Sequence, residues 1–290
     1  MKYALRKDLE PVGSSFMVKE LIEPHFDPNW HFHPHYQLFL VEEGTGTRFI
    51  GDSIKHFGPG DLVFLGPNLP HLWRSDQAYF DRQSGLTTKG TVVYFAEDFL
   101  GTEFLGKQEM TPLRHLLNHA RQGLEWTGYT RNRTETALKN LARQPIGFER
   151  VISLLTLLND LSHATDYRYL TSPGYTNTVK PNETDRMQLV HDYVLGHFPD
   201  DLSLDTIADL AGMTPPAFCR YFKTRANKTF SEFVSEVRIG HACKLLIGGK
   251  LNITQISFES GFRTLSNFNR QFKEITGQTP SSYVKTYRQL

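Results

Sequence analysis

The sequence has few cysteines and no long hydrophobic run. Its two cysteines, Cys219 and Cys243, are too few for the disulfide framework of a small secreted domain. No run of about 18 apolar residues is available to cross a bilayer, and no apolar stretch follows the charges at the N-terminus. We therefore expect a protein of the reducing cytoplasm, with neither a membrane partner nor an export signal.

An excess of charge of one sign is also missing. Lys and Arg number 32 against 31 Asp and Glu, which gives a formal net charge of +1. This balance excludes a basic coat protein and an acidic disordered tail, so any nucleic-acid surface must be confined to part of the chain. The 290 residues are 39% hydrophobic and 22% charged, a composition typical of a folded chain with room for two domains.

The first hundred residues have almost no helix signals. From about residue 12 to 100, short apolar runs alternate with turn signals such as Gly58-Pro59-Gly60-Asp61, which predicts a small β-barrel or jelly roll. The runs predicted to be strands are Leu38–Val41, Thr47–Ile50, Leu62–Leu65 and Thr91–Phe95.

Helical periodicity begins after residue 100. The predicted helices are Pro112–Gln122, Arg133–Arg143 and Gly147–His163. The last of them carries an apolar stripe made of Val151, Leu154, Leu155, Leu158 and Leu161. The stripe must be buried, either against the barrel or against the same face of a second copy, and both interpretations stay open.

A linker is expected between two domains. Residues 171–182 contain two prolines and no apolar period, so we expect a ligand-sensing domain at 1–170, a linker at 171–182 and a second domain at 183–290. Asn182 or Thr184 is expected to cap a first helix that ends at His197.

The second domain contains the pattern helix, tight turn, helix twice. In the first copy a helix at Leu204–Ala211 is followed by Gly212-Met213 and a new helix from Thr214. In the second copy Ile253–Ser260 is followed by Gly261-Phe262 and a helix near Thr264. Both predict a helix-turn-helix unit, whose second helix can enter a DNA major groove.

The second helix of each unit has one aromatic face and one polar face. The outward residues, predicted to contact DNA, are Pro216, Cys219, Arg220, Lys223, Ser266, Asn267, Asn269, Arg270 and Lys273. The arginines suit guanine and Asn269 suits adenine, whereas the lysines suit phosphate. From Met213 to the end, twelve basic residues stand against four acidic ones, which is the electrostatic footprint expected of a polyanion-binding segment.

The segment Gly261–Lys273, followed by Gly277, Thr279-Pro280 and Tyr283, resembles the signature of the AraC/XylS family of bacterial transcription regulators. The resemblance covers about the last hundred residues. It implies seven helices, with a long middle helix at about Thr229–Ile247 joining two units that contact successive major-groove segments. The sequence departs from the pattern at Asn227, where Gly is usual, and at Val284, where Arg is usual.

Histidines alternate near the start of the chain. His31, His33, His35 and Gln37 would share one face of a continuous strand, although Pro34 interrupts it. With the later His71 they resemble the cupin motif pair, in which histidines and a carboxylate bind a divalent metal. Gln37 stands in place of the carboxylate, and a neutral amide is a poorer ligand.

Three interpretations of these histidines stay open. They line a small-molecule pocket with Arg48 and Trp73, with Trp30, Phe39 and Phe64 nearby; or His31, His33 and His71 hold a metal; or they are structural residues bonded to the backbone. The stretch Gly46–Trp73 also resembles the effector domain of AraC-type regulators with an N-terminal cupin barrel.

The expected fold is therefore α+β: a cupin-like β-barrel with accessory helices, then an all-α domain with two helix-turn-helix units. We expect a cytoplasmic transcription regulator without catalytic residues. Its expected partners are double-stranded DNA and a small-molecule effector, with RNA polymerase and a second copy as further candidates. We expect that no cofactor is required, and whether the histidines bind a divalent metal stays open. The alternative function is a cupin-type metal-dependent oxygenase or isomerase with a helical appendage.

Overall fold

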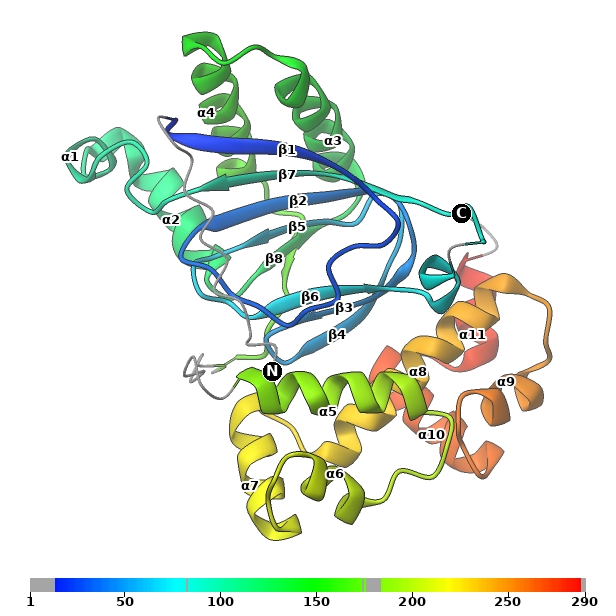
Figure 1. Ribbon diagram of the computed structural model, residues 1–290. Coiled ribbons are helices and arrows are strands. Elements are labelled where there is room, and N and C mark those ends of the chain that lie inside the picture. The colour runs from blue at the N-terminus through cyan, green and yellow to red at the C-terminus, as the bar shows by residue number, and fades with distance from the viewer. Residues whose placement is uncertain (1–13, 82, 174, 176–183, 288–290) are drawn as a thin grey trace. The chain divides into compact units, whose positions relative to one another are not determined.

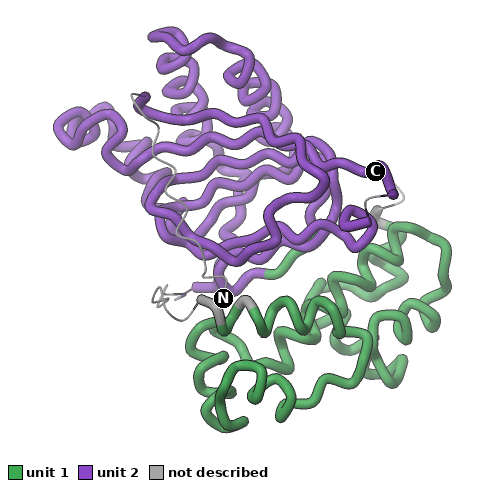
Figure 2. Tube along the Cα trace, viewed as in Figure 1, with its two compact units in different colours: residues 1–4, 54–56, 178–290 green, residues 5–53, 57–177 purple. Residues whose placement is uncertain are grey.

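The computed structural model describes residues 14–287 apart from residues 82, 174 and 176–183. The chain divides into two compact units (Figure 2). Of the described residues, the sheet unit holds nearly all those before residue 178, and the helical unit holds residues 184–287. Most of the predicted linker and the predicted cap at Asn182 lie outside the described residues.

The sheet unit contains two antiparallel sheets (Figure 1). Its strands are β1 (Phe16–Glu23), β2 (Tyr36–Glu43), β3 (Gly46–Ile50), β4 (Ser53–Phe57), β5 (Leu62–Leu65), β6 (His71–Ser75), β7 (Thr88–Phe95), β8 (Leu124–Trp126) and β9 (Tyr167–Tyr169). One sheet has the order β1-β7-β2-β5-β8-β9 and the other has the order β4-β3-β6. The four predicted strands are confirmed as parts of β2, β3, β5 and β7.

Both faces of the larger sheet are buried at β2 and β5, and alternate residues of β2 point to opposite sides. Leu38 and Leu40 pack into a core shared with helices, whereas Phe39 and Val41 pack into a second core. That second core includes Trp73 of β6, so the two sheets face each other as the predicted barrel requires. Burial on both faces explains the uninterrupted apolar run Leu38–Val41 within β2.

Helices cover the outer face of the larger sheet (Figure 1). They are α1 (Thr102–Leu105), α2 (Thr111–Ala120), α3 (Gly128–Arg143) and α4 (Phe148–His163). Three residues of the predicted α4 stripe, Leu154, Leu158 and Leu161, are buried in the core beneath the sheet. Packing against the sheets is therefore confirmed for these residues, while the dimer interpretation stays a prediction.

Seven helices form the described part of the helical unit, as the family resemblance implied. They are α5 (Thr184–His197), α6 (Leu204–Leu210), α7 (Pro215–Ala226), α8 (Phe230–Gly248), α9 (Ile253–Glu259), α10 (Leu265–Thr276) and α11 (Pro280–Tyr287). The long middle helix α8 begins with a capping box between Thr229 and Glu232. Asn227 has a φ of 53°, the left-handed conformation that Asn tolerates in place of Gly.

Aromatic side chains hold both halves of this unit to α8. Phe222 of α7 packs against Phe230 and Phe233, and its ring centroid lies 5.6 and 5.2 Å from theirs. At the other end, Phe268 and Phe272 of α10 belong to the core cluster that includes α8 residues. Among the described residues, none of the helices combines the length and the apolarity needed to cross a membrane.

Candidate nucleic-acid interface and ligand cavity

The first candidate surface is the outer face of α7. Phe218 and Phe222 are completely buried, which turns the opposite side of the helix to solvent. All four predicted contact residues of this helix are exposed: Pro216, Cys219, Arg220 and Lys223. Tyr221, which a helical period would place beside the two phenylalanines, is only half-buried.

The second candidate surface is the outer face of α10, where Phe268 and Phe272 are buried. The predicted contact residues of this helix are all exposed: Ser266, Asn267, Asn269, Arg270 and Lys273. Arg270 donates to Asn267 Oδ1 at 3.0 Å, and its Nη1 lies 3.6 Å from a Glu274 oxygen. These contacts are solvent-exposed and weak, so the guanidinium is available to a stronger partner.

The loop Phe198–Asp201, which follows α5, ties the two helix-turn-helix units together. Arg238 of α8 donates to the carbonyl oxygens of Phe198 and Asp200, both at 2.8 Å. Partial burial lowers the pKa of Arg238. Arg263, in the turn before α10, forms an exposed ion pair with Asp201.

The turn glycine of the second unit is pressed against the same loop. Gly261 has a φ of +81°, and a Cβ placed on it would stand 2.6 Å from the Phe198 carbonyl oxygen. Only glycine fits this close approach. The family signature includes Gly261, but the loop that Gly261 and Arg238 both contact lies more than 35 residues upstream and has no sequence signal of its own.

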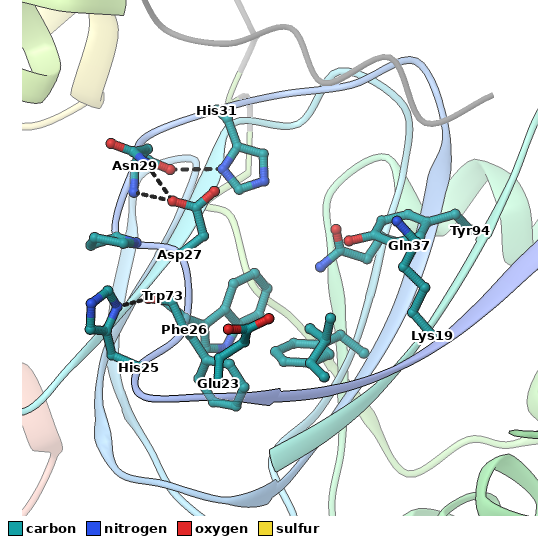
Figure 3. Close-up of a pocket in the computed structure, with 13 residues that line it drawn as sticks. Lys19, Glu23, His25, Phe26, Asp27, Asn29, His31, Gln37, Trp73 and Tyr94 are labelled. Carbon is teal, nitrogen blue, oxygen red and sulfur yellow. Dashed lines mark hydrogen bonds between the residues drawn. The ribbon is translucent and has the colours of Figure 1, made fainter. Parts of the chain in front are cut away.

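A cavity of about 420 Å³ opens between strands of the sheet unit (Figure 3). The residues that line it are Lys19, Leu21, Glu23, His25, Phe26, Asp27, Pro28, Asn29, His31, Gln37, Phe39, Trp73 and Tyr94. Phe39 and Trp73 meet edge to face, with their ring centroids 4.9 Å apart, and form an apolar wall. The remaining lining is largely polar, which suits a small molecule with apolar and polar parts.

Three of the predicted pocket residues, His31, Gln37 and Trp73, line this cavity. His33 and His71 are buried beside His31, with ring centroids 6.1 and 4.5 Å from its own. Trp30 is buried away from the lining, and Phe64 belongs to the core under the helices.

Arg48 corrects the predicted pocket, because it is not among the lining residues. Its Nε lies 3.1 Å from Asp61 and its Nη2 lies 2.8 Å from Glu125, and all three side chains are buried. The guanidinium therefore neutralises two buried carboxylates instead of facing a ligand.

Sequence reasoning missed the contribution of β1 and the loop after it. Lys19 and Glu23 of β1, with Asp27 beyond it, line the cavity. Most of β1 is exposed or half-buried, so it lacks the alternation that marks a strand. Tyr94 lies in a predicted strand, but nothing in the sequence shows which face it occupies.

The histidines do not continue β2 as one strand, because β2 begins at Tyr36. Instead, His31 forms an isolated bridge with His71 of β6, through backbone hydrogen bonds of 3.1 and 2.9 Å. One ring nitrogen from each of His31, His33 and His71 lies within 4.8 Å of those of the other two. Burial lowers the pKa of His33 to about 4, so this ring is neutral at pH 7.

Each of the three rings is also bonded to the backbone, as the structural interpretation predicted. His31 Nδ1 donates to Asn29 O at 2.7 Å, and His71 Nδ1 donates to Leu69 O at 2.7 Å. His33 Nδ1 donates to His35 O at 3.0 Å. The other ring nitrogen of His33, Nε2, lies 2.9 Å from Gln37 Oε1, so this ring is held at both of its nitrogens.

Known proteins resemble both halves of the chain. Residues 17–125 match the AraC-like ligand binding domain, and residues 207–286 match a helix-turn-helix domain. The HTH-type transcriptional regulator YdeC of Bacillus subtilis is 32% identical over 100 residues, which are 34% of this chain and 34% of YdeC. The regulator SAS0078 of Staphylococcus aureus is 28% identical over 159 residues, covering 51% of this chain and 21% of the relative. The matched segments thus cover about a third or less of the length of each of these relatives.

Solved structures are also similar. ToxT from Vibrio cholerae O395 is 15% identical and aligns over 95% of this chain and 99% of its own, with a TM-score of 0.38. The DNA-binding domain of AdpA, solved in complex with a target DNA, is 23% identical over 34% of this chain and 90% of its own, with a TM-score of 0.33. By its two domain matches, this chain belongs to the AraC family of DNA-binding transcription regulators.

Proposed function

We propose that the protein binds specific DNA sequences through α7 and α10 and that a small molecule in the cavity of the sheet unit controls this binding. The observation that carries the proposal is the matched exposure of Arg220 and Arg270 on the second helices of two units. Both units are fixed to α8 and to the loop Phe198–Asp201. A rigid pair of basic helices suits two neighbouring stretches of major groove.

The effector acts by binding one arrangement of the protein better than another, because a ligand with equal affinity for both arrangements shifts nothing. A protein with this role works in the bacterial cytoplasm. We place RNA polymerase and a second copy of the chain among its partners, and we assign it no catalytic step.

Titration of selected DNA tests the proposal. Fragments that the protein retains from a random library are labelled, and affinity is measured by fluorescence anisotropy at several salt concentrations. We expect Arg220→Ala and Arg270→Ala each to cost about 1–3 kcal/mol on the selected site and to relax preference at one base pair. Lys273→Ala should weaken all sequences alike and reduce the salt slope by about one.

Lys250→Ala is the matched control, because Lys250 is exposed and lies outside α7 and α10, the two helices assigned to the groove. If both arginine variants bind as tightly and as selectively as the wild type, the assignment of α7 and α10 to the groove is wrong. Stoichiometric iron or manganese in the purified chain, together with no DNA affinity, would favour the metal-dependent oxygenase or isomerase instead.

A further inference from the structure

The helix α8 joins the two helix-turn-helix units through different halves of its length (Figure 1). Phe233, near the start of α8, packs against Phe222 of α7, with their ring centroids 5.2 Å apart. The core that includes residues of α10 takes α8 residues from Ile239 onward. A single helix is a slender connection that can curve. A contact away from its axis is therefore needed to fix one unit relative to the other.

Arg238 makes such a contact at the point where the two halves of α8 meet. Its side chain is half-buried, and its Nε and Nη2 donate to the carbonyl oxygens of Phe198 and Asp200, both at 2.8 Å. These carbonyls belong to the loop that leads into α6, the first helix of the first unit. Two hydrogen bonds from one planar guanidinium fix both the position and the direction of this loop.

The same guanidinium lies against the turn of the second unit. Arg238 Cζ is 5.9 Å from the centroid of the Phe262 ring. Phe262 is buried and meets Phe268 of α10 edge to face, with their ring centroids 5.3 Å apart. A Cβ placed on Gly261 would stand 2.9 Å from Arg238 Nε. One side chain of α8 therefore touches a segment that leads to α6 and a segment that packs on α10.

A second contact joins the same two segments, but it is exposed. Arg263, in the turn, pairs with Asp201 of the loop, and their side chains are 79% and 80% exposed. Ion pairs in such surroundings contribute little and are screened by salt. Arg238 therefore supplies most of the connection between the loop and the turn.

We propose that Arg238 is a positioning residue that sets the spacing between the two DNA segments that α7 and α10 contact together. It acts through the loop after α5 and through Phe262. One extra base pair moves the second segment by about 3.4 Å along the duplex and by about 34° around it. Two helices held in a fixed relation cannot follow both movements, so the protein binds one spacing best. This inference rests on the proposed function.

DNAs of altered spacing test the proposal with the full-length protein. The selected site is compared with versions in which one base pair is inserted or removed between the two segments, and affinity is measured by fluorescence anisotropy. On an altered site only one unit keeps its base contacts, so the wild type should lose about 10- to 100-fold in affinity. Arg238→Gln lacks the charge and the fork of donors that hold the loop, and it should reduce this spacing ratio by about 2- to 30-fold.

The spacing ratio separates positioning from general stabilisation. A change that only destabilised the helical unit would weaken binding to all three DNAs by the same factor and leave the ratio unchanged. Ile239→Val is the matched control, because it deletes one buried methylene group beside Arg238 and leaves the hydrogen bonds of Arg238 in place. It should keep the wild-type ratio. Arg238→Lys keeps the charge but donates from a single nitrogen, so it should restore part of the ratio.

The outcomes distinguish this inference from the proposed function. If the wild type selects no DNA, the proposed function fails and this inference fails with it. If the wild type requires one spacing and Arg238→Gln requires it as strictly, or if Ile239→Val relaxes it as much, the role of Arg238 is overturned while the proposed function stands. Should circular dichroism show Arg238→Gln unfolded, the comparison of Arg238→Lys with Ile239→Val decides in the same way.

Discussion

The turn glycines of the two helix-turn-helix units provide a matched pair of perturbations. Gly212 and Gly261 both have positive φ angles, +65° and +81°. An alanine at either position costs about 1–2 kcal/mol for the left-handed conformation. At Gly212 the new methyl group meets no atom within 4 Å, so strain is the whole expected cost.

At Gly261 the methyl group also collides with the loop after α5. It would stand 2.6 Å from the Phe198 carbonyl oxygen and 2.8 Å from Pro199 Cα, closer than side-chain carbons approach backbone atoms in proteins. Backbone atoms cannot rotate aside, so the loop must shift, and overpacking of this kind costs a further ~1–3 kcal/mol. We therefore expect Gly261→Ala to destabilise the helical unit by about 2–5 kcal/mol, against about 1–2 kcal/mol for Gly212→Ala.

Native-state amide hydrogen exchange measures this difference in the full-length protein. Peptides from α8 and α10 report the opening free energy of the helical unit separately from the sheet unit. Gly261→Ala should also weaken DNA binding more than Gly212→Ala, because it displaces the loop that joins the two units. Equal losses of protection in the two variants would refute the contact between Gly261 and the loop.

Three further predictions concern charged or titratable groups that are buried or half-buried. Arg238→Ala removes two charge-assisted hydrogen bonds to the loop after α5 and should cost about 2–3 kcal/mol by the same exchange measurement. Burial lowers the pKa of His191 to about 3, from 6.5 in the unfolded chain. Between these two pKa values only the unfolded state takes up the proton. The free energy of unfolding therefore falls as the pH drops below 6.5, by up to about 1.4 kcal/mol per pH unit. His191→Phe, followed by circular dichroism, should flatten this slope, and an unchanged slope would assign it to other groups. Arg48→Met leaves Asp61 and Glu125 buried without their cation and should destabilise the sheet unit by about 3–5 kcal/mol, measured by tryptophan fluorescence. Retention of wild-type stability would mean that water reaches the two carboxylates.

The recognition helices were predictable because a local pattern defines them. Phe218 and Phe222, like Phe268 and Phe272, are four residues apart and are buried, so the exposed face follows from helical geometry alone. Glycine at each turn likewise marks a conformation that other residues adopt at a cost.

The cavity was less predictable because distant segments form it. The partners of Arg48 are Asp61 and Glu125, and Glu125 lies 77 residues further along the chain. No local sequence pattern predicts that these side chains come together. Lys19 became a lining residue only through the pairing of β1 with β7. The histidine motif was visible in the sequence, whereas the backbone carbonyls that its rings contact include Leu69 O, from a segment more than 30 residues further along the chain.

The central claim is that α7 and α10 contact successive segments on one face of DNA. Hydroxyl-radical footprinting of the full-length protein on a selected site tests it most directly. We expect two protected segments separated by about one helical turn, roughly 10 base pairs, with Arg220→Ala losing one segment and Arg270→Ala losing the other. A single protected segment, or the loss of the same segment in both variants, would contradict the account.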